Sequence, residues 1–151
     1  MLLAEALAMR ADIQRRLTSL KGRLLKVARV QEGERPDEDP AKLLSESEEL
    51  MRQLEELICR INATNSVTKF DETRTLTDAI AARDVALMRR RLLAETADAA
   101  STRQDVYSRS EVRYVSSVDV PKLRAQADEA AKEYRLLDTK IQQLNLLTEL
   151  N

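Results

Sequence analysis

The side chains best suited to bind a ligand gather in and near a polar tract, residues 105–118. If this tract is a site, Arg109 and Glu111 would hold a polar ligand, with Tyr107 and Tyr114 as its walls. Arginine brings donors that suit a carboxylate or a phosphate. The same charged groups can instead pair with one another and fix an interface, which is their commoner role. The candidate polar site or interface comprises Arg83, Asp84, Tyr107, Arg109, Glu111, Arg113 and Tyr114.

Several kinds of catalytic site are excluded by residue types that the chain lacks. With no histidine and one cysteine, it cannot build the common zinc sites or the Ser-His-Asp and Cys-His arrangements. It has no glycine-rich phosphate loop. An all-carboxylate site for a hard cation stays open, but the densest acidic cluster, residues 32–39, lacks the spacing of a calcium loop. We therefore expect no catalytic, cofactor-binding or metal-binding residues, no cofactor, and a function other than catalysis.

The composition predicts long helices in a cytoplasmic protein. Of 151 residues, 34% are charged and 3% aromatic, with 2 Gly and 3 Pro, which is typical of helical proteins and not of sandwiches or barrels. No run of 18 apolar residues is present to span a membrane. The apolar start, residues 1–4, is broken by Glu5 and is unlike a signal peptide. Together with the lone Cys59, these features indicate a reducing, cytoplasmic setting.

Four segments carry the periodicity of helices, and we expect these over about 2–32, 40–65, 76–101 and 120–150. Gly33 is expected to close the first helix, because glycine readily adopts the left-handed conformation. Asp39 and Pro40 are expected to begin the second helix, and Thr75 with Asp78 to form a capping box for the third.

Three of these helices show a single apolar seam with alternating spacings of three and four, as in a coiled coil. The expected seams are Leu3, Ala6, Arg10, Ile13, Leu17, Leu20, Leu24 and Val27; then Leu43, Ser47, Leu50, Leu54, Leu57 and Ile61; and finally Val120, Leu123, Ala127, Ala130, Tyr134, Leu137, Ile141 and Leu144.

The third helix differs, because apolar residues occupy two of its sides. One side carries Ala81, Val85, Met88, Leu92 and Ala99, and another carries Leu76, Ile80, Leu87 and Ala94. A helix that is apolar on two sides is usually central or touches two partners.

These elements predict an all-α fold, an elongated antiparallel four-helix bundle or coiled coil that forms one helical domain over residues 1–151. Near 105–118, β-forming Val and Tyr residues predict a short extended or β-like arm. The alternative is a pair of helical hairpins, splayed apart and completed by another subunit.

Opposite charges predict that the first two helices pair with each other. Residues 10–29 contain seven basic side chains against one acidic, and residues 37–58 contain eight acidic against two basic. Such charges commonly flank the seam of a coiled coil. A nucleic-acid surface is the alternative, but no aromatic residue is interleaved with the basic ones for base stacking. We therefore expect no nucleic acid among the partners.

Several stretches, in their order and spacing, resemble the septicolysin-like family of short, largely uncharacterised bacterial helical proteins. They are Val30–Glu34 with Glu38–Pro40, Ile61–Asn65, Arg74–Ala79, Tyr107–Glu111 and Val115–Val120. The resemblance covers nearly the whole chain. It implies a compact helical protein, and the family name implies a cytolysin.

The sequence thus favours a self-associating structural or protein-interaction module. Leu136, Leu146 and Leu150 lie off the seam of the last helix, and Leu147 flanks it. An exposed apolar patch generally marks an interface, so we expect a homo-oligomer, with a further protein partner unidentified and no membrane span. The alternatives are a septicolysin-like cytolysin, and a small-ligand binder or enzyme that uses the 105–118 tract.

Overall fold

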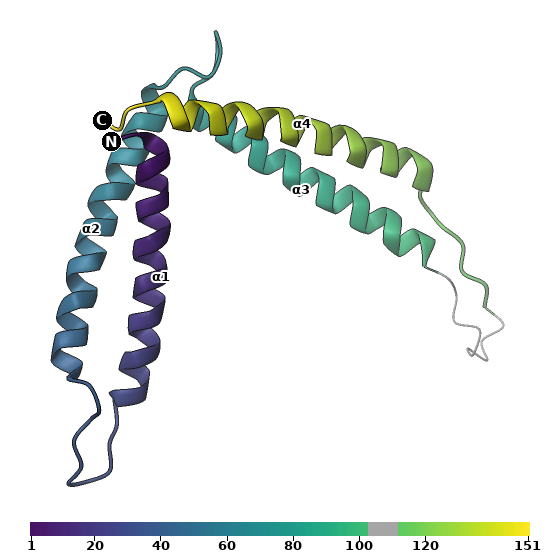
Figure 1. The fold of residues 1–151 in the computed structure, drawn as a ribbon. Coiled ribbons are helices and arrows are strands. Elements are labelled where there is room, and N and C mark those ends of the chain that lie inside the picture. The colour runs from purple at the N-terminus through teal and green to yellow at the C-terminus, as the bar shows by residue number, and fades with distance from the viewer. Residues whose placement is uncertain (103–111) are drawn as a thin grey trace. The chain divides into compact units, whose positions relative to one another are not determined.

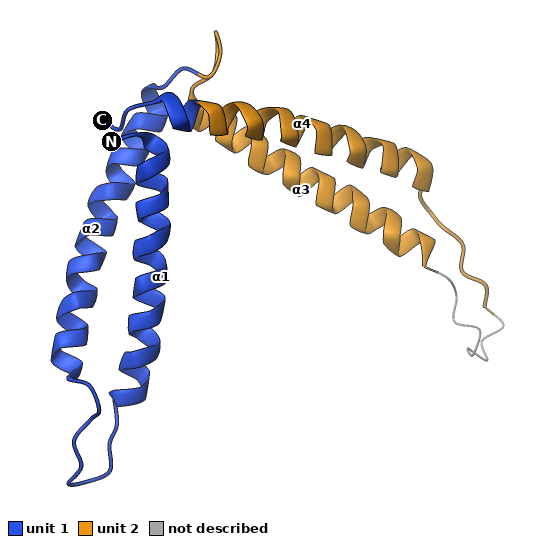
Figure 2. Ribbon diagram, in the orientation of Figure 1, with its two compact units in different colours: residues 1–69, 144–151 blue, residues 70–143 orange. Residues whose placement is uncertain are grey.

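The fold is all-α, as the sequence predicts. The computed structural model describes residues 1–102 and 112–151, in which the helices are α1 (Leu3–Val27), α2 (Pro40–Val67), α3 (Leu76–Ser101) and α4 (Val120–Leu147) (Figure 1). The chain divides into two compact units, residues 1–69 with 144–151 and residues 70–143 (Figure 2). The expectation of one helical domain over 1–151 stays a prediction.

The first unit is built on the hairpin of α1 and α2, which run side by side (Figure 1). Its core is the seam that the periodicity predicts, since Leu3, Ala6, Ile13, Leu20 and Val27 of α1 are buried, as are Leu43, Ser47, Leu50, Leu57 and Ile61 of α2. The predicted charge pairing is present at two points of this unit. Arg16 lies 3.5 Å from Glu46, and Arg23 binds Glu38.

The first helix ends five residues earlier than expected, at Val27 instead of residue 32. Val27 is the last apolar residue of the seam, and Val30 beyond it is exposed, so nothing holds another helical turn against α2. Gly33 does adopt the left-handed conformation, with a φ of +86°. It does so in a separate turn, in which the Glu34 amide donates to the Gln31 carbonyl at 3.0 Å.

The residues after α4 pack against the start of the chain. The Leu3 amide donates to the Thr148 carbonyl, and the Leu150 amide donates to the Met1 carbonyl, both at 2.8 Å. These bonds end the helix at Leu147, three residues before the expected end, and they bury Leu150. The prediction that Leu150 belongs to an exposed patch was therefore wrong, whereas Leu136, Leu146 and Leu147 are exposed.

The second unit contains α3 and most of α4, and the loop before α3 fixes where that helix begins. The predicted capping box is confirmed, because the Asp78 amide donates to the Thr75 hydroxyl and the Thr75 amide donates to the Asp78 carboxylate. Asp71 accepts hydrogen bonds from the backbone and side chain of Arg74. The buried ring of Phe70 lies under Lys140 of α4, 4.4 Å from ring centre to Nζ.

The packed side of α3 is formed by Leu76, Ala79, Ala86 and Ala97, and that of α4 by predicted seam residues, including Ala127, Ala130, Leu137 and Ile141. The predicted arm near 105–118 is described only from Val112 onward. Residues 112–118 form no strand, and Tyr114 and Val115 are exposed.

Candidate interaction site

An unpartnered apolar stripe runs along the side of α3 that faces away from its packed residues. It consists of Ala81, Val85, Met88 and Leu92, which we call the outer α3 stripe. Val85, Met88 and Leu92 are 61%, 65% and 67% exposed. The geometry follows from the helix period, because two residues correspond to about 200° of turn. Ala81 follows the buried Ala79 by two positions, and Met88 follows the buried Ala86 in the same way.

The corresponding sides of the other helices are polar or small. The positions two residues after a buried seam residue include Arg15 and Gly22 in α1, Arg52 and Cys59 in α2, and Lys132 and Thr139 in α4. Scattered exposed apolar residues are normal on a protein surface. A continuous apolar stripe on a helix whose opposite side is already packed indicates a second packing partner.

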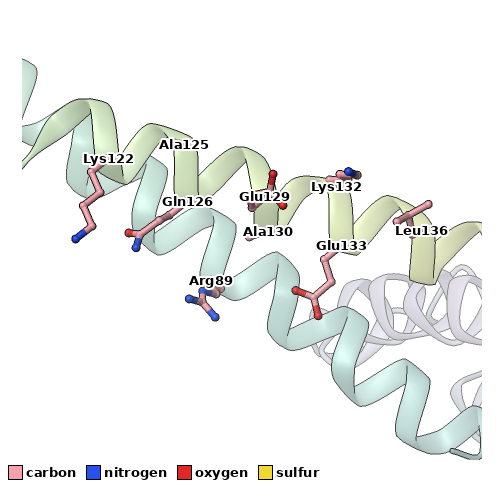
Figure 3. Close-up of a pocket in the computed structure, with 9 residues that line it drawn as sticks. All are labelled: Arg89, Lys122, Ala125, Gln126, Glu129, Ala130, Lys132, Glu133 and Leu136. Carbon is pink, nitrogen blue, oxygen red and sulfur yellow. The ribbon is translucent and has the colours of Figure 1, made fainter.

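Charged side chains flank the outer α3 stripe. Asp84 and Arg91 lie along one edge of it, and Arg89 lies along the other. On the Arg89 edge, α3 and α4 border an open groove of about 530 Å³. Figure 3 shows Gln126 and Glu133 of α4 extending toward α3, on which Arg89 lies. Arg89 is four residues after Val85 and three before Leu92, so it neighbours both on the helix surface and the groove adjoins the stripe.

Arg83 lies on the packed side of α3 and joins this helix to α4. Its Nη1 donates to Asp138 Oδ1 at 3.0 Å, and its Nε donates to Asp84 Oδ1 at 3.0 Å. Burial, the largest single effect, lowers the pKa of Arg83. The hydrogen bonds to Asp84 and Asp138, together with the attraction of these two negative charges, outweigh burial, so the pKa is raised above its ordinary value. Arg83 therefore stays charged and is held between two carboxylates.

The candidate residues chosen from the sequence are not brought into one cluster by the part of the chain that is described. Tyr114 borders a hollow with Thr96, Ala99 and Thr102, near the end of α3. Arg83 lies near the other end, roughly 24 Å away along the helix from Ala99 at 1.5 Å per residue. Arg113 is exposed. Tyr107, Arg109 and Glu111 lie outside the described residues, so their predicted role in a ligand site or an interface stays a prediction.

Two contributors to this region were not identified from the sequence. Asp138 is the partner of Arg83 across the helices, and no local pattern reveals it because the contact depends on the register of α4. Phe70, the one phenylalanine in the chain, falls between the second and third predicted helices, where no pattern indicates its contact with Lys140. The signal for the outer α3 stripe was present, since α3 was expected to be apolar on two sides.

Two other kinds of feature are absent from residues 1–102 and 112–151. No group of three or more acidic or cysteine side chains there is placed to hold a metal ion. Each helix in these ranges is too polar or too short to cross a membrane.

Comparison with known proteins gives a family and a solved relative. A family model described as a family of unknown function, DUF6847, matches residues 10–150. The chain belongs to the DUF6847 family. A crystal structure of a functionally unknown conserved protein from Corynebacterium diphtheriae is also similar, with 52% sequence identity and a TM-score of 0.92. The match covers 100% of this chain and 99% of that one. No curated protein matches the chain.

The solved relative supports the all-helical fold, and neither the family nor the solved relative carries a statement of activity. Neither the family nor the solved relative is described as septicolysin-like. The resemblance to septicolysins, and the cytolytic activity that it implies, stay predictions.

Proposed function

We propose that this DUF6847 protein is a self-associating, helical protein-interaction module that works in a reducing, cytoplasmic setting. The observation that carries the proposal is the outer α3 stripe, an apolar surface on a helix that is already packed on its opposite side. Burying apolar surface is the main driving force of protein association. An exposed stripe of this kind therefore gains free energy when a partner covers it.

The geometry around Arg83 also supports an interaction role over a ligand site. Its guanidinium donors are directed at Asp84 and Asp138 of its own unit. An arginine that is bound to two carboxylates in this way is not free to receive an anionic ligand. The exposed thiol of Cys59 suits a compartment in which thiols stay reduced.

The mass of the protein in solution tests the proposal. Light scattering coupled to size exclusion, over a range reaching high micromolar concentration, should give a mass above the 17.2 kDa of one chain. The mass should rise with concentration, as expected for reversible association. A mass of one chain at every concentration would contradict the proposal.

A further inference from the structure

We propose that the partner of the outer α3 stripe is the same stripe on a second copy of the chain, with the two α3 helices antiparallel about a two-fold axis at the middle of the stripe. This inference rests on the proposed function and names the surface and the partner that it requires. It follows from the spacing of the four apolar residues and from the charges beside them.

The spacing of the four apolar residues is the same in both directions along the helix. Ala81, Val85, Met88 and Leu92 are separated by four, three and four residues, so the stripe is symmetric about the point between residues 86 and 87. An antiparallel copy centred there places Val85 opposite Met88 and Ala81 opposite Leu92, each pair occurring twice. Two-fold pairs use the same surface on both subunits, as this arrangement does.

The stripe ends in a charged residue on each side, which limits the contact to these four layers. Asp78 precedes Ala81 by one layer and Glu95 follows Leu92 by one layer. The apolar contact is therefore about 16 Å long, from the rise of 1.5 Å per residue between Ala81 and Leu92. In the proposed register Asp78 of each copy faces Glu95 of the other at the ends of the contact, where water screens the two like charges. A shift by one layer would instead place one of these carboxylates against an apolar residue, which costs free energy unless the charge finds a partner.

The charges along one edge are complementary in this register. Asp84 and Arg91 lie on the same edge of the stripe and on opposite sides of its centre, about 4 Å and about 7 Å from it along the helix at 1.5 Å per residue. The two-fold axis therefore brings Asp84 of each copy beside Arg91 of the other, giving two ion pairs. The Asp84 side chain is 59% exposed next to Arg83 and can reach a second partner. Opposite charges at such flanking positions set the orientation of helix pairs.

The first test is a charge placed in the stripe. Met88→Glu would bury a carboxylate at the contact, which is expected to raise the dissociation constant by about tenfold or more. Leu25→Glu, at an exposed apolar residue of the first unit, is the matched control and should leave association unchanged. Both positions are exposed, so both variants should fold, and circular dichroism checks this. If the wild type associates and Met88→Glu associates equally well, this inference fails while the proposed function stands. If the wild type is monomeric, both fail.

The second test reverses the flanking charges and probes the register. Asp84→Arg alone and Arg91→Asp alone should each weaken self-association, because each places like charges at both ion pairs. An equimolar mixture of the two variants should recover it, since every Asp84–Arg91 pair then has opposite signs again. A mixture no stronger than the separate variants would overturn the antiparallel register.

Discussion

The ion pair between Arg83 and Asp138 should contribute measurably to the stability of the second unit. Its atoms lie 3.0 Å apart, and the two side chains are 22% and 31% exposed. Exposed pairs are worth about 0.2–1 kcal/mol, whereas removing one partner of a buried pair costs about 3–5 kcal/mol. Since this pair is partly shielded from water, Arg83→Met is expected to lower the free energy of unfolding by about 1–2 kcal/mol.

A double-mutant cycle measures the pair itself. Arg83→Met, Asp138→Ala and the double variant, each unfolded with urea, should give a coupling energy of about 1 kcal/mol. The same hairpin offers a matched control, because Arg124 and Asp98 also join α4 to α3 at 3.0 Å but are 49% and 68% exposed. The corresponding cycle with Arg124→Met and Asp98→Ala should give less than about 0.5 kcal/mol.

Two results would refute this reasoning. Equal coupling energies in the two cycles would mean that burial does not set the strength of the pair. No coupling between Arg83 and Asp138, with both single variants as stable as the wild type, would mean that the contact is not structural. In that case the arginine would again be a candidate for ligand binding.

Three further predictions concern the folds of the two units. Leu20→Ala should cost about 2–5 kcal/mol of unfolding free energy, because Leu20 is buried in the α1 seam. Leu25→Ala, at an exposed position of the same helix, should change that free energy by no more than about 0.5 kcal/mol. Equal losses for the two variants in urea melts would mean that the seam is misplaced. Thr75→Ala removes the cap of α3. It should lower the free energy of unfolding by about 1 kcal/mol and speed amide exchange in the first turn of that helix. Unchanged exchange would show that Thr75 does not cap the helix. Hydrogen bonds from Arg74 and from the Thr73 backbone lower the pKa of Asp71 to about 2. The ionised Asp71 therefore stabilises the protein fully above a pH of about 4, and this effect is lost as the pH falls through about 2. Asp71→Asn should flatten the decline in stability over this range, and an unaltered pH profile would show that Asp71 does not cause it.

The helices, and the buried sides of α1, α2 and α4, were predictable because they depend on local periodicity. In α3 only Leu76 of the two predicted apolar sides is buried, and the other buried residues are alanines that belong to neither side. The seam from Leu3 to Val27 and the cap at Thr75 are set by residues within a few positions of one another, so a single sequence contains the information. The same holds for the start of α2, where the Asp39 side chain accepts from the Ala41 amide next to Pro40.

Features that depend on distant contacts were missed. Leu150 was placed in an exposed patch, but backbone pairing with Met1 buries it. The periodicity gives no sign of a contact between the two ends of the chain. Asp138 could not be assigned to Arg83 for a related reason, because the register between α3 and α4 fixes that pair. The first helix ends at Val27 and not next to Gly33, because the contacts of the seam end at Val27. The position of a glycine was therefore a poorer guide to the end of this helix than the end of its apolar seam.

The central claim, an antiparallel contact between two outer α3 stripes, is tested most directly by disulfide trapping. In a Cys59→Ser background, chains carrying Ala81→Cys are mixed with chains carrying Leu92→Cys and oxidised mildly. A disulfide needs Cα atoms within about 7 Å. Antiparallel pairing places residue 81 opposite residue 92, while two residues 81, or two residues 92, lie about 16 Å apart along the helices. Disulfides are expected between the two different chains in the mixture, with almost none in either chain alone. Disulfides within each separate variant, and none between the two variants, would show a parallel contact and contradict the antiparallel one. The absence of any disulfide would show that the stripes do not meet.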